Sequence, residues 1–179
     1  MKEGNKQILL CNTNRVSKDF LKSIKFRLNG KYKKIPNYLI EKTGKVHNLN
    51  KNDVTTEYLE GYTTSGVVVV CLENIGSLVL LKRRTKDGKF VDWLGDIYIN
   101  KVHEKKWRGN LFWDEYSDKQ MESTLNLIKK VCDKENIPND FIGHNVLVDG
   151  IEHFKGIVSR SNYNEYWTDI NPSFNFELL

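Results

Sequence analysis

Residues 66–72 read GVVVVCL and contain no charged or amide side chain. Four consecutive β-branched valines favour an extended strand. Because this strand has no polar side, both of its faces are expected to be covered, as in the middle of a sheet that carries helices. Residues 66–72 therefore predict an α/β protein built around a central sheet.

The segments around this strand supply its neighbours. Gln7 to Cys11 predicts a first strand, and residues 37–41 and 45–49 predict a hairpin whose turn is Thr43-Gly44. Ser17 is expected to cap a helix that ends near Gly30 and has apolar residues at helical spacing, namely Phe20, Leu21, Ile24 and Leu28.

A capping box at residues 117–120 (SDKQ) predicts the start of a longer helix with Met121, Leu125, Ile128 and Cys132 on one face. Residues 76–116 hold three of the four tryptophans, and we expect an elaborated insertion with short strands there. Phe141 to Leu179 is predicted to be loop-rich. The expected fold is a single α/β domain over residues 1–179, with a mixed central β-sheet flanked by helices.

Composition excludes several classes of protein. The chain has 179 residues, a net charge of +5 and a mean hydropathy of −0.54. No apolar run approaches the ~20 residues that span a bilayer. The first residues lack a signal-peptide core, so synthesis in the cytoplasm without a signal peptide is expected. Three scattered cysteines argue against a disulfide framework.

The positive charge has two readings. Solvated lysines explain it without a partner, whereas a polyanionic partner would be nucleic acid or an anionic cell envelope. Residues 101–108 (KVHEKKWR) combine basic side chains with Trp107 and could hold a glycan or nucleic acid, although such a run is more often a surface turn. Nucleic acid is the weaker reading because only charge supports it.

Three residues could carry chemistry. Cys11 ends the first strand, His144 follows Gly143, and Asp169 precedes a turn that contains Pro172. Taken singly, each residue type in these settings is usually structural.

Taken together with short motifs in a fixed order, these residues resemble a known family. The motifs are residues 7–13 (QILLCNT), 36–44 (PNYLIEKTG), 70–76 (VCLENIG), 116–132 with its Gln, 143–144 (GH) and 168–174 (TDINPSF). The chain is similar in these places to the type 2, zinc-dependent N-acetylmuramoyl-L-alanine amidases, the group of phage lysozyme, AmpD-like and peptidoglycan-recognition proteins.

The resemblance implies a zinc ion held by Cys11, His144 and Asp169, and hydrolysis of the amide between N-acetylmuramic acid and L-alanine. A catalytic zinc takes three protein ligands and a water, and a cysteine thiolate is an accepted ligand. The family has a histidine at the place of Cys11, so the thiolate would make the metal a weaker Lewis acid.

This sequence departs from the family pattern at three further positions where family members carry residues that take part in the reaction. Some family members carry a tyrosine at the place of Pro36, a glutamate at Cys71 and a lysine at Trp167. Other residues of this chain could supply the lost roles, and the candidates are Glu73 as a base and Arg160 and Tyr163 near the substrate. Loop ordering is an equally good reading of Arg160 and Tyr163, and a structural hydrogen-bond role is a good reading of Glu73.

Three functions follow as hypotheses. The first is a peptidoglycan hydrolase acting at the cell wall, most plausibly a phage endolysin used in lysis. The second is a catalytically silent amidase-fold protein that binds peptidoglycan or another protein, as a virion component or a regulator. The third is a nucleic-acid binder, which only the charge supports.

Overall fold

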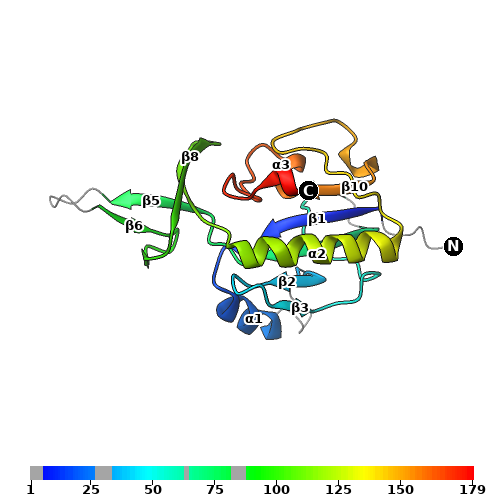
Figure 1. Cartoon of the computed structure of the whole chain (residues 1–179), viewed down its shortest axis with the longest axis horizontal. Helices are drawn as coiled ribbons and strands as arrows, with labels where there is room; N and C mark the ends of the chain where they lie inside the picture. The colour runs from blue at the N-terminus through cyan, green and yellow to red at the C-terminus, as the bar shows by residue number, and fades with distance from the viewer. Residues whose placement is uncertain (1–5, 27–33, 63–64, 82–87) are drawn as a thin grey trace.

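The computed structural model describes residues 6–26, 34–62, 65–81 and 88–179 (Figure 1). The expected helix residue Leu28 and the expected helix stop Gly30 lie outside these residues. Within the described part of the chain, no helix combines the length and the hydrophobicity needed to cross a membrane.

A five-stranded mixed sheet forms the centre of the molecule, as the sequence predicted. Its strand order is β10 (Gly156–Ser159), β1 (Gln7–Asn12), β4 (Val67–Leu72), β2 (Tyr38–Ile40) and β3 (Val46–Asn48). The first four strands run parallel, and β3 pairs antiparallel with β2 through the expected hairpin. Every residue of β1 and β4 is buried, which confirms the reading of the valine run as a central strand.

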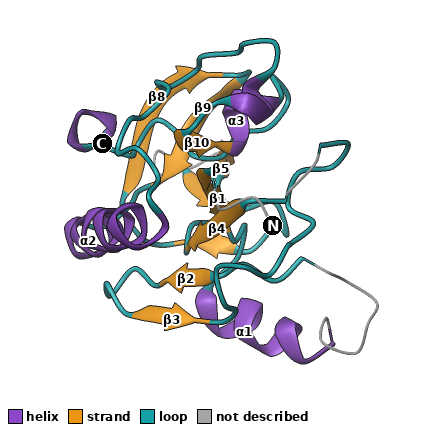
Figure 2. Cartoon of the chain, turned by 90° about the vertical axis from the view of Figure 1, so that its right-hand side faces the viewer, coloured by secondary structure: helices purple, strands orange, loops and turns teal. Residues whose placement is uncertain are grey.

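Two helices cover the two faces of this sheet. Ile8 and Leu10 of β1 point to the face that packs against α2 (Asp118–Glu135), whereas Leu9 and Cys11 point to the face that packs against α1 (Ser17–Phe26). This alternation follows from the period of two along a strand. Figure 2 shows the two helices at different sides of the sheet.

The predicted cap of α2 by Ser117 is confirmed, but the second half of the predicted capping box, the bond from the Gln120 side chain, is not formed. Ser117 accepts a hydrogen bond from the backbone N–H of Gln120 at 3.1 Å. The Gln120 side chain does not return to the cap, because it donates to the carbonyls of Ile40 and Glu73. The buried face of α2 is accordingly displaced from the expected one and contains Gln120, Thr124, Ile128, Val131 and Cys132. The expected cap of α1 is not seen, because Ser17 Oγ is buried without a hydrogen-bond partner.

The insertion around residues 76–116 is more regular than expected. It forms a second five-stranded sheet in the order β7 (Ile97–Tyr98), β6 (Lys89–Val91), β5 (Ser77–Leu81), β9 (Asn110–Asp114) and β8 (Val102–Trp107). All of its pairings are antiparallel. In Figure 1 this sheet projects to one side of the central body.

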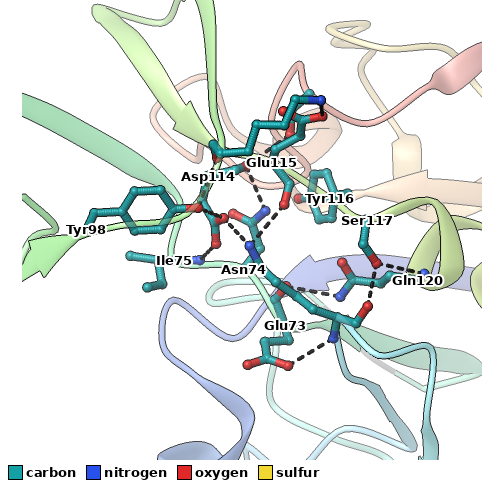
Figure 3. A network of polar contacts seen from close by, with 12 residues as sticks. Glu73, Asn74, Ile75, Tyr98, Asp114, Glu115, Tyr116, Ser117 and Gln120 are labelled. Atoms are coloured by element: carbon teal, nitrogen blue, oxygen red, sulfur yellow. Dashed lines mark hydrogen bonds and ion pairs between the residues drawn. The ribbon is translucent and has the colours of Figure 1, made fainter. Parts of the chain in front are cut away.

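A buried polar network joins the second sheet to the first (Figure 3). Asp114 has no exposed surface, and its carboxylate accepts hydrogen bonds from Lys42 Nζ, the Tyr98 hydroxyl and the N–H of Ile75, the last at 2.7 Å. Asn74 donates to the Asp114 carbonyl at 2.9 Å. Burying a carboxylate is costly unless it is hydrogen-bonded and paired, and the partners of Asp114 come from both sheets, so the network fixes the base of the projecting sheet.

The chain after α2 is loop-rich, as expected. It contains β10, the short helix α3 (Arg160–Tyr163) and the 3-10 turns η2 (Ile151–His153) and η3 (Phe176–Leu178). Through β10, this segment returns to the central sheet beside β1. The candidate site lies where β1 and β10 end.

Candidate functional site

The carboxyl ends of β1, β4 and β10 meet at one edge of the central sheet. Cys11 is paired in register with Cys71 of β4. On the other side of β1, Leu10 is paired with Ser159, the last residue of β10. Extending this parallel register by one residue places Arg160 beside Cys11. The edge therefore carries two thiols and a guanidinium.

The two thiols form a closed, buried pair. Cys11 Sγ and Cys71 Sγ are 2.6 Å apart in hydrogen-bond contact, and both side chains have no exposed surface. Burial raises the pKa of the Cys11 thiol, and the hydrogen bond with Cys71 raises it further. Cys11 is thus a neutral thiol with a partner.

Asp169 lies at the same edge and is 4% exposed. Its Oδ2 accepts a hydrogen bond from the backbone N–H of Asn12 at 3.1 Å, and Arg160 Nη1 lies 3.4 and 3.5 Å from its two oxygens. Burial raises the pKa of Asp169 above its usual range, against the lowering by Arg160 and the Asn12 N–H. Both carboxylate oxygens are therefore already engaged by groups of this chain.

Arg160 is held by an ion pair and by an aromatic ring. Its Nη1 pairs with Asp169, and its guanidinium carbon lies 4.3 Å from the centre of the Trp167 ring. The Asp169 backbone is held in turn, because its carbonyl accepts from the N–H of Ser161 at 2.7 Å. Burial lowers the pKa of Arg160, but the charge of Asp169, the neighbouring Cys11 and Cys71 and the hydrogen bond with Asp169 together outweigh it, so the pKa is raised overall. The side chain is therefore a permanent cation in a fixed place.

His144 is not at this edge. Its ring stacks on Phe176 at 4.1 Å and lies 4.9 Å from Trp107, and its Nδ1 is buried without a partner. Burial, with the charges of Lys105 and Arg108, lowers the pKa of His144 to about 4. His144 is a neutral aromatic side chain between the C-terminal turn and β8.

The prediction of His144 as a metal ligand is therefore corrected. His144 follows a short apolar step at residues 141–142 and a glycine. In the structure Phe141 makes only an isolated bridge to Ile157, and the strand beside β1 is β10. The residue that follows this strand is Arg160. The signal was present in the sequence, since residues 156–160 (GIVSR) also form an apolar step followed by a polar residue.

Glu73 and Tyr163, the other predicted catalytic residues, have structural contacts. The Glu73 carboxylate accepts from the N–H groups of Ser17 at 3.0 Å and Lys42 at 2.9 Å. The Tyr163 hydroxyl donates to Gln7 Oε1, at the first residue of β1 and so at the far end from Cys11. Glu73 ties α1 to the hairpin, and Tyr163 anchors α3.

The residues at the edge do not fit a zinc ion. The described part of the chain contains no group of three or more His, Cys, Asp or Glu side chains arranged to hold a metal. Cys11 Sγ is in contact with Cys71 Sγ, both oxygens of Asp169 are engaged, and the third place holds a guanidinium, which is never a ligand. The predicted set of Cys11, His144 and Asp169 is thus not assembled, because His144 follows a different segment of the chain.

A pocket of about 470 Å³ opens over this edge. Of the described residues that line it, three are cationic (Arg15, Lys34 and Arg160) and none is acidic, while Phe20 and Tyr58 are among its apolar walls. Lys34 pairs with Glu60, and Arg160 with Asp169. Arg15 Nε is buried without a hydrogen-bond partner. Such a lining favours an anionic ligand.

Comparison with known proteins supports the fold. The sequence matches no protein-family model and no curated protein sequence. The structure is similar to the N-acetylmuramyl-L-alanine amidase AmiD from E. coli in complex with anhydro-N-acetylmuramic acid-L-Ala-D-gamma-Glu-L-Lys, with a TM-score of 0.62 and 11% identity. This chain has the fold of these amidases. The likeness covers 99% of this chain and 56% of AmiD.

Two further solved structures have a similar fold. AmpDh3 from Pseudomonas aeruginosa in complex with an anhydromuramic pentapeptide matches with a TM-score of 0.59 and 12% identity, over 99% of this chain and 60% of that chain. The amidase LysC from Clostridium intestinale matches with a TM-score of 0.53 and 10% identity, over 98% of this chain and 83% of that one. The predicted fold class is confirmed, and this chain spans little more than half the length of AmiD.

Proposed function

We propose that this chain binds peptidoglycan stem peptides in the pocket over the carboxyl ends of β1 and β4, without hydrolysing them. The observation that carries the proposal is Arg15 in the lining of that pocket, because its Nε is buried without a hydrogen-bond partner. The other two described cations of the lining, Lys34 and Arg160, are paired with Glu60 and Asp169. The amidase fold adds support, since AmiD and AmpDh3 are complexed with anhydromuramic peptides.

The chemistry of the ligand matches the lining. In a peptide containing a γ-linked D-Glu, the α-carboxylate of that residue is free. Arg15, whose guanidinium forms no ion pair with any described residue, can bind such a carboxylate by paired N–H donors. Trp93, which is 56% exposed, stands at the pocket with its indole N–H bonded to Asn14 O at 2.7 Å. It offers an apolar wall to a peptide or a sugar.

Binding without hydrolysis follows from the residues beside the pocket. Hydrolysis in this fold would require a Lewis acid or an activated water at the sheet edge. That edge contains Arg160 paired with Asp169 and the neutral Cys11 thiol, and Glu73 is engaged by two backbone N–H groups. No described group there is free to activate water.

Hydrolysis of the muramoyl–L-alanine amide is the second candidate, and the likeness to three amidases favours it. The endolysin role belongs to this candidate, with action at the cell wall after lysis begins. It requires that groups outside the described sheet edge carry the reaction.

One experiment separates the two candidates. The anhydromuramyl tripeptide that AmiD carries is titrated into the chain by calorimetry, and the mixture is then analysed by mass spectrometry for free tripeptide. Binding without release supports our proposal. Release of a peptide with an L-alanine N-terminus overturns it in favour of the amidase, and absence of both binding and release contradicts both.

Arg15→Met tests the pocket, with Lys18→Met on the exposed surface of α1 as the matched control. We expect Arg15→Met to weaken binding about tenfold, which corresponds to about 1.4 kcal/mol. Lys18→Met should leave binding unchanged. Equal effects of the two substitutions would show that only overall charge matters.

A further inference from the structure

We propose that the guanidinium of Arg160 is a built-in replacement for the metal ion of this fold, so that the chain keeps the sheet edge folded and charge-balanced without metal. This inference goes beyond the proposed function and does not depend on it, because metal content and stability are measured without any peptide.

The position of Arg160 follows from strand register. β10 pairs in parallel with β1, and the last paired residues are Leu10 and Ser159. Arg160 follows Ser159 directly as the first residue of α3, and its Nη1 lies 3.4 Å from Asp169 Oδ2, which also accepts from the N–H of Asn12, the residue next to Cys11. Cys11 is the strand-end residue at which the resembled family keeps its first metal ligand. The cation of Arg160 thus stands next to that place.

Arg160 contacts a buried carboxylate and an aromatic ring, and both stabilise a positive charge. Asp169, 4% exposed, would be a costly buried charge without a positive partner. Arg160 Nη1 lies 3.4 and 3.5 Å from its oxygens, and the Asn12 N–H supplies a further donor at 3.1 Å. Trp167 covers the guanidinium at 4.3 Å. The carboxylate and the guanidinium therefore neutralise each other inside the protein.

The same contacts exclude a metal ion. Zinc at this edge would lie beside a permanent positive charge and would have to displace it from Asp169. Cys11 Sγ already contacts Cys71 Sγ at 2.6 Å. Replacing Arg160 by a metal-binding side chain removes the competing cation and adds a donor at the same time. The exclusion of metal therefore rests mainly on one residue.

The first test is metal content. Wild type, Arg160→His, Arg160→Met and the double variant Cys11→His/Arg160→His are each incubated with zinc sulfate, dialysed and analysed by elemental analysis. We expect no retained zinc in wild type and Arg160→Met. We expect one zinc ion per chain in Arg160→His, which would offer a thiol, an imidazole and a carboxylate, and in the double variant. Circular dichroism reports whether each variant is folded.

Two results would overturn the inference. One is stoichiometric zinc in wild type that is lost in Asp169→Asn. The other is a folded Arg160→His variant that retains no zinc. The double variant places a larger side chain at the fully buried Cys11 position, so it can fail to fold. In that case the zinc content of Arg160→His alone tests the inference, because position 160 lines the pocket and has room for the smaller imidazole.

A second measurement needs no metal. Arg160→Met should lower Tm by several degrees, because Asp169 loses its counter-charge. Adding Asp169→Asn to Arg160→Met should recover most of that loss, since the unpaired charge is then removed. If Arg160→Met melts like wild type and the second substitution changes nothing, Arg160 does not act as the replacement cation.

Discussion

Cys11 and Cys71 face each other directly across β1 and β4, with their sulfur atoms 2.6 Å apart and no exposed surface on either side chain. Thiolates, not thiols, react with alkylating reagents, and burial raises the pKa of Cys11. We therefore predict that iodoacetamide at pH 8 leaves Cys11 and Cys71 unmodified in the native protein and modifies both in urea. Mass spectrometry of the digested chain measures this. Rapid labelling of Cys11 in the folded protein would contradict the closed pair.

His144 is predicted to make stability depend on pH. Burial lowers its pKa in the folded protein to about 4, whereas an unfolded histidine titrates near 6.5. The unfolded state therefore binds a proton first as pH falls. The stabilising effect of neutral His144 is complete above about pH 6.5 and is lost as pH falls toward 4.

His144→Phe keeps a ring against Phe176 but cannot titrate. The fall in Tm between pH 7.5 and pH 5 should be smaller in this variant than in wild type. His153→Phe is the matched control, since that imidazole is 84% exposed, and it should behave like wild type. An identical pH dependence in all three proteins would refute the buried, neutral assignment of His144.

Asp114 is predicted to stabilise the junction of the two sheets. Its carboxylate has no exposed surface and accepts from Lys42, Tyr98 and the Ile75 N–H. Asp114→Asn keeps the size but leaves Lys42 without its counter-charge, and we expect a loss of roughly 3 kcal/mol in the free energy of unfolding. Urea denaturation measures the loss.

The neighbouring Glu115 provides the control for Asp114. It pairs with Lys101 at 2.6 Å, and the Lys101 side chain is 81% exposed. Glu115→Gln should cost less than about 1 kcal/mol because exposed ion pairs contribute little. Equal losses for the two substitutions would show that the network in Figure 3 does not hold the junction.

Glu73 is predicted to be structural and not a general base. Glu73→Ala removes the acceptor of the Ser17 and Lys42 N–H groups and should lower the free energy of unfolding by roughly 2 kcal/mol. Binding of the anhydromuramyl tripeptide should remain unchanged. Glu122→Ala, at an exposed position of α2, is the stability control. If Glu73→Ala has wild-type stability but alters a measurable amide hydrolysis, Glu73 is the base.

The elements that the sequence predicts correctly are those whose signal is local. The runs at residues 8–11 and 67–72 contain no charged, amide or hydroxyl side chain, and only a strand covered on both faces can bury them. Ser117 lies three residues before Gln120, and the cap between them needs no distant partner. The α/β class, the hairpin and α2 follow from such patterns.

The candidate site was decided by pairing between distant segments. Residues 141–144 and 156–160 are both apolar steps that end in a polar residue, and either could follow a strand beside β1. The local sequence of these two segments does not indicate which of them follows the strand beside β1, because strand register is fixed by packing against the whole sheet. The resemblance of the sequence to the amidases predicted that Cys11 and Asp169 lie at the same edge of the sheet. Only the tertiary structure decided that Arg160, and not His144, pairs with Asp169 at this edge, because a parallel partner of β1 is chosen by burial and register over a separation of about 150 residues.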